Sequence, residues 1–244
     1  MIVKLLVEYD GTAYCGWQIQ PNGDTVQEEL EKALFSLTGR KISVTGSGRT
    51  DSGVHAKGQV ASFAVAEENI PAERYAPALN TLLPQDIRVL KSERAAEHFN
   101  ARFSAKKKTY RYTFYLSDVV RPLFDRYAVR SGPLDVGKMQ EAAALFVGEK
   151  DFRSFCAANS AVKDTVRTVY RADVERAGEF VTLTVCGNGF LYNMVRIMAG
   201  TLAEVGEGRL TAADVQGILE GKKRGAGRTA PAKGLCLMGV EYSS

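Results

Sequence analysis

This chain of 244 residues contains few of the residues on which metal and thiol chemistry depend. It has two histidines and four cysteines, and no two cysteines have the C-x-x-C spacing of a metal or redox site. A structural zinc site would need ligands from four distant segments. We therefore expect catalysis, if any, to rest on carboxylates, Tyr, Lys, Arg or the two histidines. The cysteines, expected to be reduced thiols packed as small core residues, are Cys15, Cys156, Cys186 and Cys236.

The chain also lacks a segment suited to crossing a membrane or directing export. The uncharged stretch at 181–195 contains Thr, Asn and Gly and is too short to span a bilayer. Charge enters at Lys4, too early for a signal peptide. Glycine and proline are near background use, 45% of residues are hydrophobic and the net charge is only +4, which excludes collagen-like and disordered chains. The composition predicts a soluble, cytoplasmic, globular protein.

Hydrophobic periodicity predicts an α+β fold with a mixed, mostly antiparallel sheet. The order strand, helix, strand, strand, helix, strand occurs in each half, although the two halves share no sequence repeat. This order favours two related subdomains, at 1–103 and 104–244, over a doubly wound parallel fold. The expected strands are 3–9, 41–45, 59–65, 87–90, 109–116, 165–175, 180–186 and 237–242, and the expected helices are 25–39, 72–83, 135–148, 190–202 and 211–219.

Positive charge is concentrated in two segments. Between Arg102 and Arg130 there are eight Lys or Arg and two acids, an excess larger than the +4 of the whole chain. In KKKTYRYTFY the cations are interleaved with aromatic rings, a pattern that suits phosphate contacts and base stacking. A second cationic cluster lies in the acid-free segment 222–233. Two such clusters favour nucleic-acid binding, although lysines also protect the edge of a sheet from aggregation.

The segment GSGRTDSGVH, residues 46–55, is a polar loop between two expected strands. It is not a dinucleotide fingerprint, because Asp51 occupies the place of the third glycine, and it is not a P-loop, because Gly-Lys-Ser/Thr is missing. Its three glycines allow positive φ angles and the close approach of a ligand. Asp51 is either a turn aspartate bonded to its own backbone or a reactive carboxylate.

This loop and four further segments resemble one enzyme family. GSGRTDSGVHAKGQVASF is similar to the catalytic loop of pseudouridine synthases, and specifically of the tRNA pseudouridine synthase A family. The further segments, in the family's order, are VEYDGTAYCGWQIQPNGDTVQEELEKAL, NARFSAKKKTYRY, GNGFLYNMVRIMAG and APAKGLCLMGVEY. Together they span nearly the whole chain, and R-T-D-x-G-V-H-A is a specific signature.

The resemblance implies an isomerase that converts uridine to pseudouridine at positions 38–40 of the tRNA anticodon stem-loop. It also implies the family's α+β fold with the active cleft between two subdomains, and a homodimer in which one tRNA touches both subunits. The reaction detaches uracil from C1′, rotates it and rejoins it through C5, so it needs no cofactor, metal or energy source. The target base lies inside a folded RNA and must be flipped out.

Three residues match the family's catalytic positions. Asp51 matches the catalytic aspartate, which could attack C1′ or the base or remove a ribose proton. Arg196 matches the family's arginine and is expected to pair with Asp51 and keep it ionised; the alternative is an arginine that snorkels to the helix surface. Tyr110 matches the active-site tyrosine, which stacks on the uracil and helps to move the C5 proton; the alternative is packing against Tyr112 or Phe114.

Further residues are expected to contact substrate or RNA. Arg49 would fill the vacated base stack or hold a neighbouring phosphate. His55 would contact the RNA backbone or brace the loop. Phe190 and Leu191 would wall the uracil pocket or, alternatively, start a helix as core residues. The residues expected at the RNA backbone are Lys106, Lys107, Lys108, Arg111, Lys222, Lys223 and Arg224.

Two other classes of function fit part of the sequence. A non-catalytic RNA-binding module would explain the basic aromatic strand but not an arginine within an apolar helix. A carboxylate-dependent hydrolase normally divides acid and base roles between two acids, whereas the charged neighbours of Asp51 are Arg49 and Lys57. Within the family, a ribosomal or small RNA is the nearer alternative to tRNA.

Overall fold

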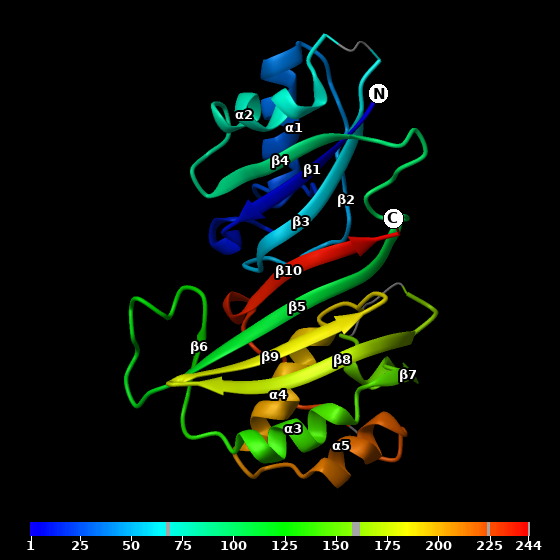
Figure 1. Ribbon diagram of the computed structural model, residues 1–244. Coiled ribbons are helices and arrows are strands. Elements are labelled where there is room, and N and C mark those ends of the chain that lie inside the picture. The colour runs from blue at the N-terminus through cyan, green and yellow to red at the C-terminus, as the bar shows by residue number, and fades with distance from the viewer. Residues whose placement is uncertain (67–68, 158–161, 224, 244) are drawn as a thin grey trace. The chain divides into compact units, whose positions relative to one another are not determined.

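A computed structural model describes residues 1–66, 69–157, 162–223 and 225–243, which form two compact units (Figure 1). Unit 1 comprises Met1–Lys106 and Leu237–Ser244, and unit 2 comprises Lys107–Cys236. The first boundary lies close to the one expected after residue 103. The residues from Leu237 onward, however, group with unit 1 and not with the second half, in which the sequence analysis placed them.

Unit 1 is a sheet with strand order β4-β1-β3-β10, in which β1 runs antiparallel to both of its neighbours and β2 pairs with β3. Its two helices lie side by side (Figure 1). The strands are β1 (Ile2–Tyr9), β2 (Thr45–Gly46), β3 (His55–Ala64), β4 (Ile87–Ala95) and β10 (Leu235–Tyr242), the helices are α1 (Val26–Thr38) and α2 (Tyr75–Asn80), and short 3-10 turns span Gly11–Ala13 and Ala72–Arg74.

Two expected elements of unit 1 are shorter than the sequence predicts, whereas the strands expected at 59–65 and 87–90 extend to His55–Ala64 and Ile87–Ala95. The strand expected at 41–45 is reduced to β2, because the side chains of α1 take up the backbone groups of Val44: Glu31 accepts its N–H at 2.9 Å and Gln27 donates to its carbonyl at 3.0 Å. The helix expected at 72–83 divides into a 3-10 turn and the short α2. The ends of α1 are confirmed, with Thr25 as N-cap and Gly39 in the left-handed conformation at φ 69°.

Unit 2 is an antiparallel sheet of order β5-β9-β8-β7, to which β6 adds a short parallel pairing with β5. Helices α3, α4 and α5 pack together on one face, and α3 contacts β8 (Figure 1). The strands are β5 (Ala105–Leu116), β6 (Val129–Ser131), β7 (Gly148–Asp151), β8 (Val166–Ala177) and β9 (Phe180–Gly187), the helices are α3 (Val136–Ala144), α4 (Met194–Gly206) and α5 (Ala212–Leu219), and 3-10 turns span Arg153–Phe155 and Ala232–Gly234.

Helix α4 begins later than its hydrophobicity predicts. The expectation was a start at 190, but Asn193 has φ 59° and ψ 7°, and helical geometry begins only at Met194. A left-handed residue cannot lie inside a right-handed helix, so Phe190 and Leu191 belong to the preceding turn. Arg196 consequently lies in the first turn of α4.

The two units share one topology. In unit 1 the first strand, β1, pairs with β3, and β3 pairs with β2; in unit 2 the first strand, β5, pairs with β9, and β9 pairs with β8. In unit 1 helix α1 follows β1 and helix α2 follows β3; in unit 2 helix α3 lies in the chain between β5 and β8, and helix α4 follows β9. This common order supports the expectation of two related subdomains and confirms the α+β class with mostly antiparallel strands.

The cysteines are less buried than expected. All four belong to the described part of the chain, none forms a disulfide, and each is half-buried, so their use as fully buried core residues is wrong. The core is built instead from branched and aromatic side chains, such as Leu5 in unit 1 and Phe146 in unit 2. Within the described ranges, the helices are all too short or too polar to cross a membrane.

Two helical glycines of unit 2 predict opposite effects of the same substitution. A Cβ on Gly200 of α4 would lie 1.7 Å from the carbonyl oxygen of Arg228, whereas a Cβ on Gly217 of α5 would meet only the Cβ of Lys223, at 3.5 Å. Gly200→Ala should destabilise the protein by about 1–3 kcal/mol through overpacking. Gly217→Ala should stabilise it by about 0.5–1 kcal/mol, because alanine favours the helix. Urea unfolding measures both, and equal effects would contradict the close packing of α4.

Candidate active site

The loop 47–54 carries Asp51 between β2 and β3 of unit 1. The side chain of Asp51 is half-buried and that of Arg49 is exposed. The Asp51 carbonyl accepts the N–H of Val54 at 3.1 Å, and Gly53 has φ 76°. Of the glycines expected to supply positive φ angles, Gly53 therefore does so. Asp51 is presented at the start of a tight turn that its own main-chain carbonyl closes.

Residues 11–17 support this loop through backbone contacts. The N–H of Trp17 donates to the Thr50 carbonyl at 3.1 Å. A Cβ on Gly11 would lie 1.9 Å from the Val54 carbonyl oxygen, and a Cβ on Gly16, at φ 92°, would lie 2.5 Å from the Thr50 carbonyl oxygen. Only glycine permits an approach this close. The two backbones are consequently packed against each other on either side of Asp51.

Buried side chains of β1 and β3 form hydrogen bonds with the same loop. Gln59, fully buried, donates from Nε2 to the Gly48 carbonyl at 3.0 Å and accepts from Oγ of Ser47 at 2.6 Å. The hydroxyl oxygens of Tyr9 and Thr50 are 2.7 Å apart and buried. The hydroxyls of Ser47 and Thr50, which enter the core from the loop, thus both meet partners, as a stable buried network requires.

His55 braces the loop from the start of β3. Its ring is buried, and Nδ1 accepts the N–H of Gly11 at 3.1 Å while lying 3.1 Å from Oδ1 of Asp10. Of the two roles expected for His55, these contacts support the bracing one.

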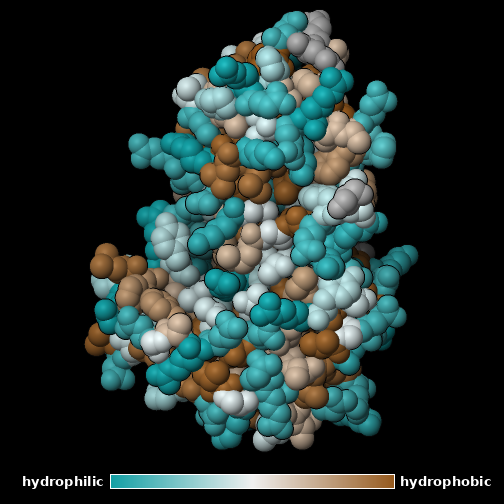
Figure 2. Space-filling view, viewed as in Figure 1, coloured by the Kyte–Doolittle hydropathy of each residue, from teal (hydrophilic) through white to brown (hydrophobic). Residues whose placement is uncertain are grey.

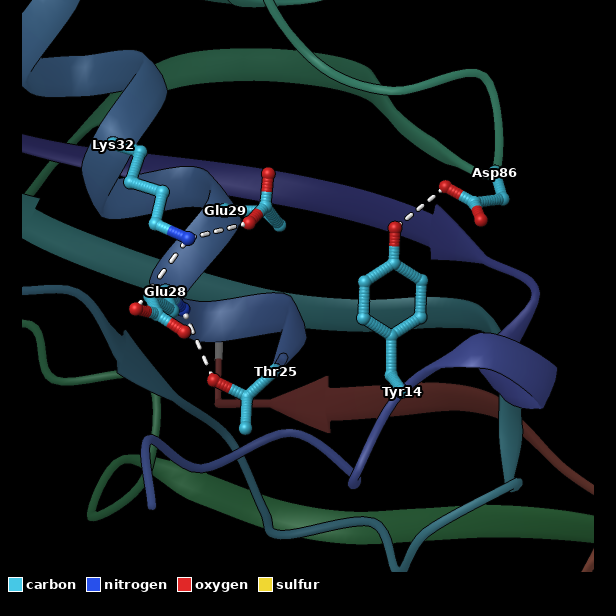
Figure 3. A network of polar contacts seen from close by, with 6 residues as sticks. All are labelled: Tyr14, Thr25, Glu28, Glu29, Lys32 and Asp86. Atoms are coloured by element: carbon cyan, nitrogen blue, oxygen red, sulfur yellow. Dashed lines mark hydrogen bonds and ion pairs between the residues drawn. The ribbon is translucent and has the colours of Figure 1, made fainter. Parts of the chain in front are cut away.

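A polar network anchors the supporting segment to the rest of unit 1 (Figure 3). The Tyr14 carbonyl accepts from the N–H of Gly53 at 3.3 Å and from Oγ of Ser52 at 3.2 Å, and the Tyr14 hydroxyl donates to Asp86 at 2.6 Å. Burial raises the pKa of Tyr14, and the Asp86 carboxylate raises it further, so the hydroxyl remains a donor at neutral pH. The nearby first turn of α1 is closed by the Thr25 cap.

In unit 2, Tyr110 lies on β5 opposite Val185 of β9. Its side chain is 7% exposed and its ring meets that of Phe190 edge-on, with centroids 5.4 Å apart. Tyr112 and Phe114, on the same face of β5, pack against each other at 4.8 Å. Tyr110 thus packs with Phe190, a partner that neither of the two expected roles named.

Arg196 is fixed by the protein's own oxygens. Its Nε donates to the Ala230 carbonyl and its Nη1 to Oδ1 of Asn193, both at 2.8 Å. The half-buried guanidinium is therefore held at two of its donors, which a snorkelling arginine would turn toward water. Burial raises the pKa of Tyr112, and the nearby charges of Arg196 and Arg228 offset part of that shift.

The expected RNA-binding cations of β5 are available on its surface. Lys106, Lys107 and Arg111 are exposed and Lys108 is half-buried. The ammonium of Lys107 lies 5.7 Å from the ring centroid of Tyr170 on β8. Cations and an aromatic ring thus meet in one region of unit 2, which combines the groups needed for phosphate and base contacts.

Two lysines of the second expected cluster pair with acids. Lys222 contacts Glu220 at 2.7 Å and Lys223 contacts Asp214 at 2.5 Å. The hydrogen bond from Lys223, with those of Thr211, lowers the pKa of Asp214 to about 2. Arg224 lies outside the described residues. The acids that neutralise these lysines come from α5 and its C-terminal end, so the acid-free run of sequence does not translate into an acid-free surface.

Sequence reasoning missed the residues that position the site. Gln59 and Asn193 were given no role, although one fastens the Asp51 loop and the other bonds Arg196. A glutamine within the apolar strand QVASFAV was the available signal for Gln59. No group of three or more His, Cys, Asp or Glu is placed to hold a metal ion in the part of the chain that the structure covers.

Comparison with known proteins gives relatives that match almost the full length of this chain. A model of the tRNA pseudouridine synthase family matches residues 5–104 and 142–243. The tRNA pseudouridine synthase A of Geobacter sp. (strain M21) is 51% identical over 243 residues, 98% of this chain and 98% of its own. The protein of the same name from Moorella thermoacetica is 49% identical over 244 residues, 98% of this chain and 99% of its own. The crystal structure of a Cbf5-Nop10-Gar1 complex aligns with 96% of this chain and 57% of its own, at 14% identity and TM-score 0.38.

The buried amide of Gln59 predicts a pH-dependent effect of Gln59→Glu. At about pH 8 the new carboxylate cannot donate to Gly48, and we expect a loss of about 1–3 kcal/mol in unfolding free energy. Burial raises the pKa of this carboxyl above its unfolded value, so the loss should grow as pH rises and shrink toward about pH 5, where the protonated carboxyl of the variant donates again. Urea unfolding at both pH values measures it. A pH-independent loss would contradict the buried bond, and Gln18→Glu at an exposed site is the control.

Proposed function

This chain belongs to the tRNA pseudouridine synthase family and isomerises uridine to pseudouridine in tRNA. We propose that it acts in the cytoplasm, at positions 38–40 of the anticodon stem-loop. We further propose that Asp51 is the essential carboxylate. The observation that carries the proposal for Asp51 is the construction of its loop. Main-chain contacts from residues 11–17 and buried side chains from β1 and β3 fix the backbone on both sides of Asp51, and its side chain stays half-buried.

The isomerisation exchanges one bond for another within a single nucleotide. The bond between C1′ and N1 breaks, a bond between C1′ and C5 forms, C5 loses a proton and N1 gains one. An ionised Asp51 would open this sequence by attacking C1′ or the base, or by removing a ribose proton. A fixed loop contributes in each case, because a carboxylate already held in position loses less entropy on reaching the transition state.

Arg196 and Tyr110 would complete the chemistry from unit 2. We assign Arg196 the role of pairing with Asp51 and keeping it ionised, because its guanidinium is held rigidly by Ala230 and Asn193. We assign Tyr110 to the flipped uracil, with Phe190 supporting its ring edge-on. Leu191 is buried and would act as part of the wall behind them, while the exposed Arg49 would occupy the vacated stack.

The tRNA backbone would be held mainly by the cations of β5. Lys106, Lys107 and Arg111 are exposed on that strand, and Lys107 lies beside the ring of Tyr170. Each phosphate contact releases counterions and makes binding salt-dependent. The β5 cations would therefore contribute to that dependence.

A homodimer is the second part of the proposal. In Figure 2 hydrophobic residues gather on the segment between β5 and β6. Leu123 is 91% exposed and Val119 64%. The segment is nevertheless well fastened, since Asp125 bonds both Tyr115 at 2.8 Å and Lys233 at 2.6 Å. A rigid surface with several exposed apolar side chains is typical of a protein interface.

We predict that Asp51→Asn and Asp51→Ala abolish turnover, with a loss on the order of 10³-fold or more, because neither variant has an ionised carboxylate. Tritium release from unmodified tRNA labelled at uracil C5 measures the rate, and mapping of the modified nucleotides measures the position. Affinity for tRNA should stay nearly unchanged, and Asp173→Asn in unit 2 serves as the control. Retained turnover would overturn the role of Asp51, and modification confined to other positions would overturn the assignment to 38–40.

We predict that Leu123→Asp converts a dimer into monomers, because a buried carboxylate without a partner opposes association. Sedimentation velocity at micromolar concentration measures the change. Leu90→Asp, at a leucine of β4 that is 53% exposed, should leave the dimer intact. A wild-type chain that sediments as a monomer would contradict the homodimer, and a dimer that survives Leu123→Asp would place its interface elsewhere.

A further inference from the structure

The turn before α4 contains an unusual backbone conformation. Asn193 has φ 59° and ψ 7°, and it is the only non-glycine residue with a positive φ in the ranges that the structure describes. L-residues adopt this left-handed region at a cost in free energy, which is smaller for Asn than for most side chains. Such a conformation persists where the surrounding structure holds it, and it often accompanies a functional constraint.

The side chain of Asn193 does not perform the task usual for its position. An asparagine before a helix ordinarily accepts a backbone N–H of the first turn. Asn193 makes no such cap bond; its Oδ1 accepts instead from Nη1 of Arg196, three residues on, at 2.8 Å. The side-chain oxygen thus serves a guanidinium and not the helix terminus.

A second acceptor fixes the other edge of the same guanidinium. Nε of Arg196 donates to the Ala230 carbonyl at 2.8 Å, and the N–H of Ala230 returns a bond to the Arg196 carbonyl at 3.1 Å. The segment 228–230 is held against α4, because Gly200 allows the Arg228 carbonyl to approach the helix. Two oxygens on one planar group define its plane as well as its place.

We propose that Asn193 is a positioning residue for Arg196: its left-handed backbone directs Oδ1 at Nη1, and this bond with the one to Ala230 sets the orientation in which the guanidinium meets the reacting site. The proposal rests on the catalytic role of Arg196 in the proposed function. A planar guanidinium pairs well with a carboxylate only in a defined orientation, so its plane matters as much as its charge. The strain at Asn193 is then the consequence of aiming the side chain.

Three variants separate the side chain from the backbone. Asn193→Gly keeps the left-handed backbone and deletes the acceptor, Asn193→Asp keeps an acceptor oxygen, and Arg196→Ala removes the group that is positioned. We expect Asn193→Gly to lower kcat about tenfold and to leave KM for tRNA within about twofold of the wild-type value. Its thermal stability should equal or exceed that of the wild type. Asn193→Asp should recover most of the rate, because its carboxylate still accepts from Nη1.

The double variant Asn193→Gly/Arg196→Ala decides whether Asn193 acts through Arg196. If it does, the double variant is no slower than Arg196→Ala alone; a purely structural role would add its own loss. Wild-type kcat in Asn193→Gly, or additive losses in the double variant, would overturn the positioning role and leave the proposed function intact. Wild-type kcat in Arg196→Ala would instead overturn the assignment of Arg196 itself, and the positioning role with it.

Discussion

The loop that carries Asp51 depends on a close approach between two stretches of main chain. The Val54 carbonyl lies so close to Gly11 that a Cβ would not fit between them. The backbone of residues 50–54 therefore packs directly against the segment 11–17. A loop outside regular secondary structure has few hydrogen-bond partners for its backbone. Here residues 11–17 provide them, through the N–H of Trp17 and the carbonyl of Tyr14. The segment 11–17 is anchored in turn by Asp86 and by the start of α1, whose Val26 and Gln27 N–H groups donate to the carbonyls of Gly16 and Trp17.

A reactive carboxylate places demands on the loop that presents it. The backbone must stay fixed without relying on that carboxylate, because a substrate has to compete for the same lone pairs. Gln59, His55 and the Tyr9–Thr50 hydroxyl pair fasten the loop and its supporting segment through buried polar groups of their own. The structure thereby assigns much of the work of holding the loop to residues other than the one proposed to react.

In unit 2, too, the side chains that we propose to react are held in place by other residues. Ala230 and Asn193 hold the guanidinium of Arg196, and the ring of Tyr110 packs edge-on against Phe190. The turn before α4 connects the two, because Phe190 and Asn193 belong to that one segment, between β9 and the helix. A change in the conformation of this turn would therefore alter the positions of both Arg196 and Tyr110.

The class of fold, most strands and helices, and the family could be predicted from the sequence, since periodic hydrophobic patterns and the R-T-D-x-G-V-H-A signature are local properties. It also indicated Asp51, Tyr110 and Arg196, because motif positions carry over residue by residue. It placed the start of α4 wrongly, because an apolar run does not reveal the left-handed backbone of Asn193, and it read the cations after α5 as unopposed, because Glu220 and Asp214 lie outside the run. The contacts of Gln59, Gly11 and Asn193 could not be predicted in this way. They join residues that are distant in the sequence or depend on backbone angles, and composition and spacing do not encode that geometry.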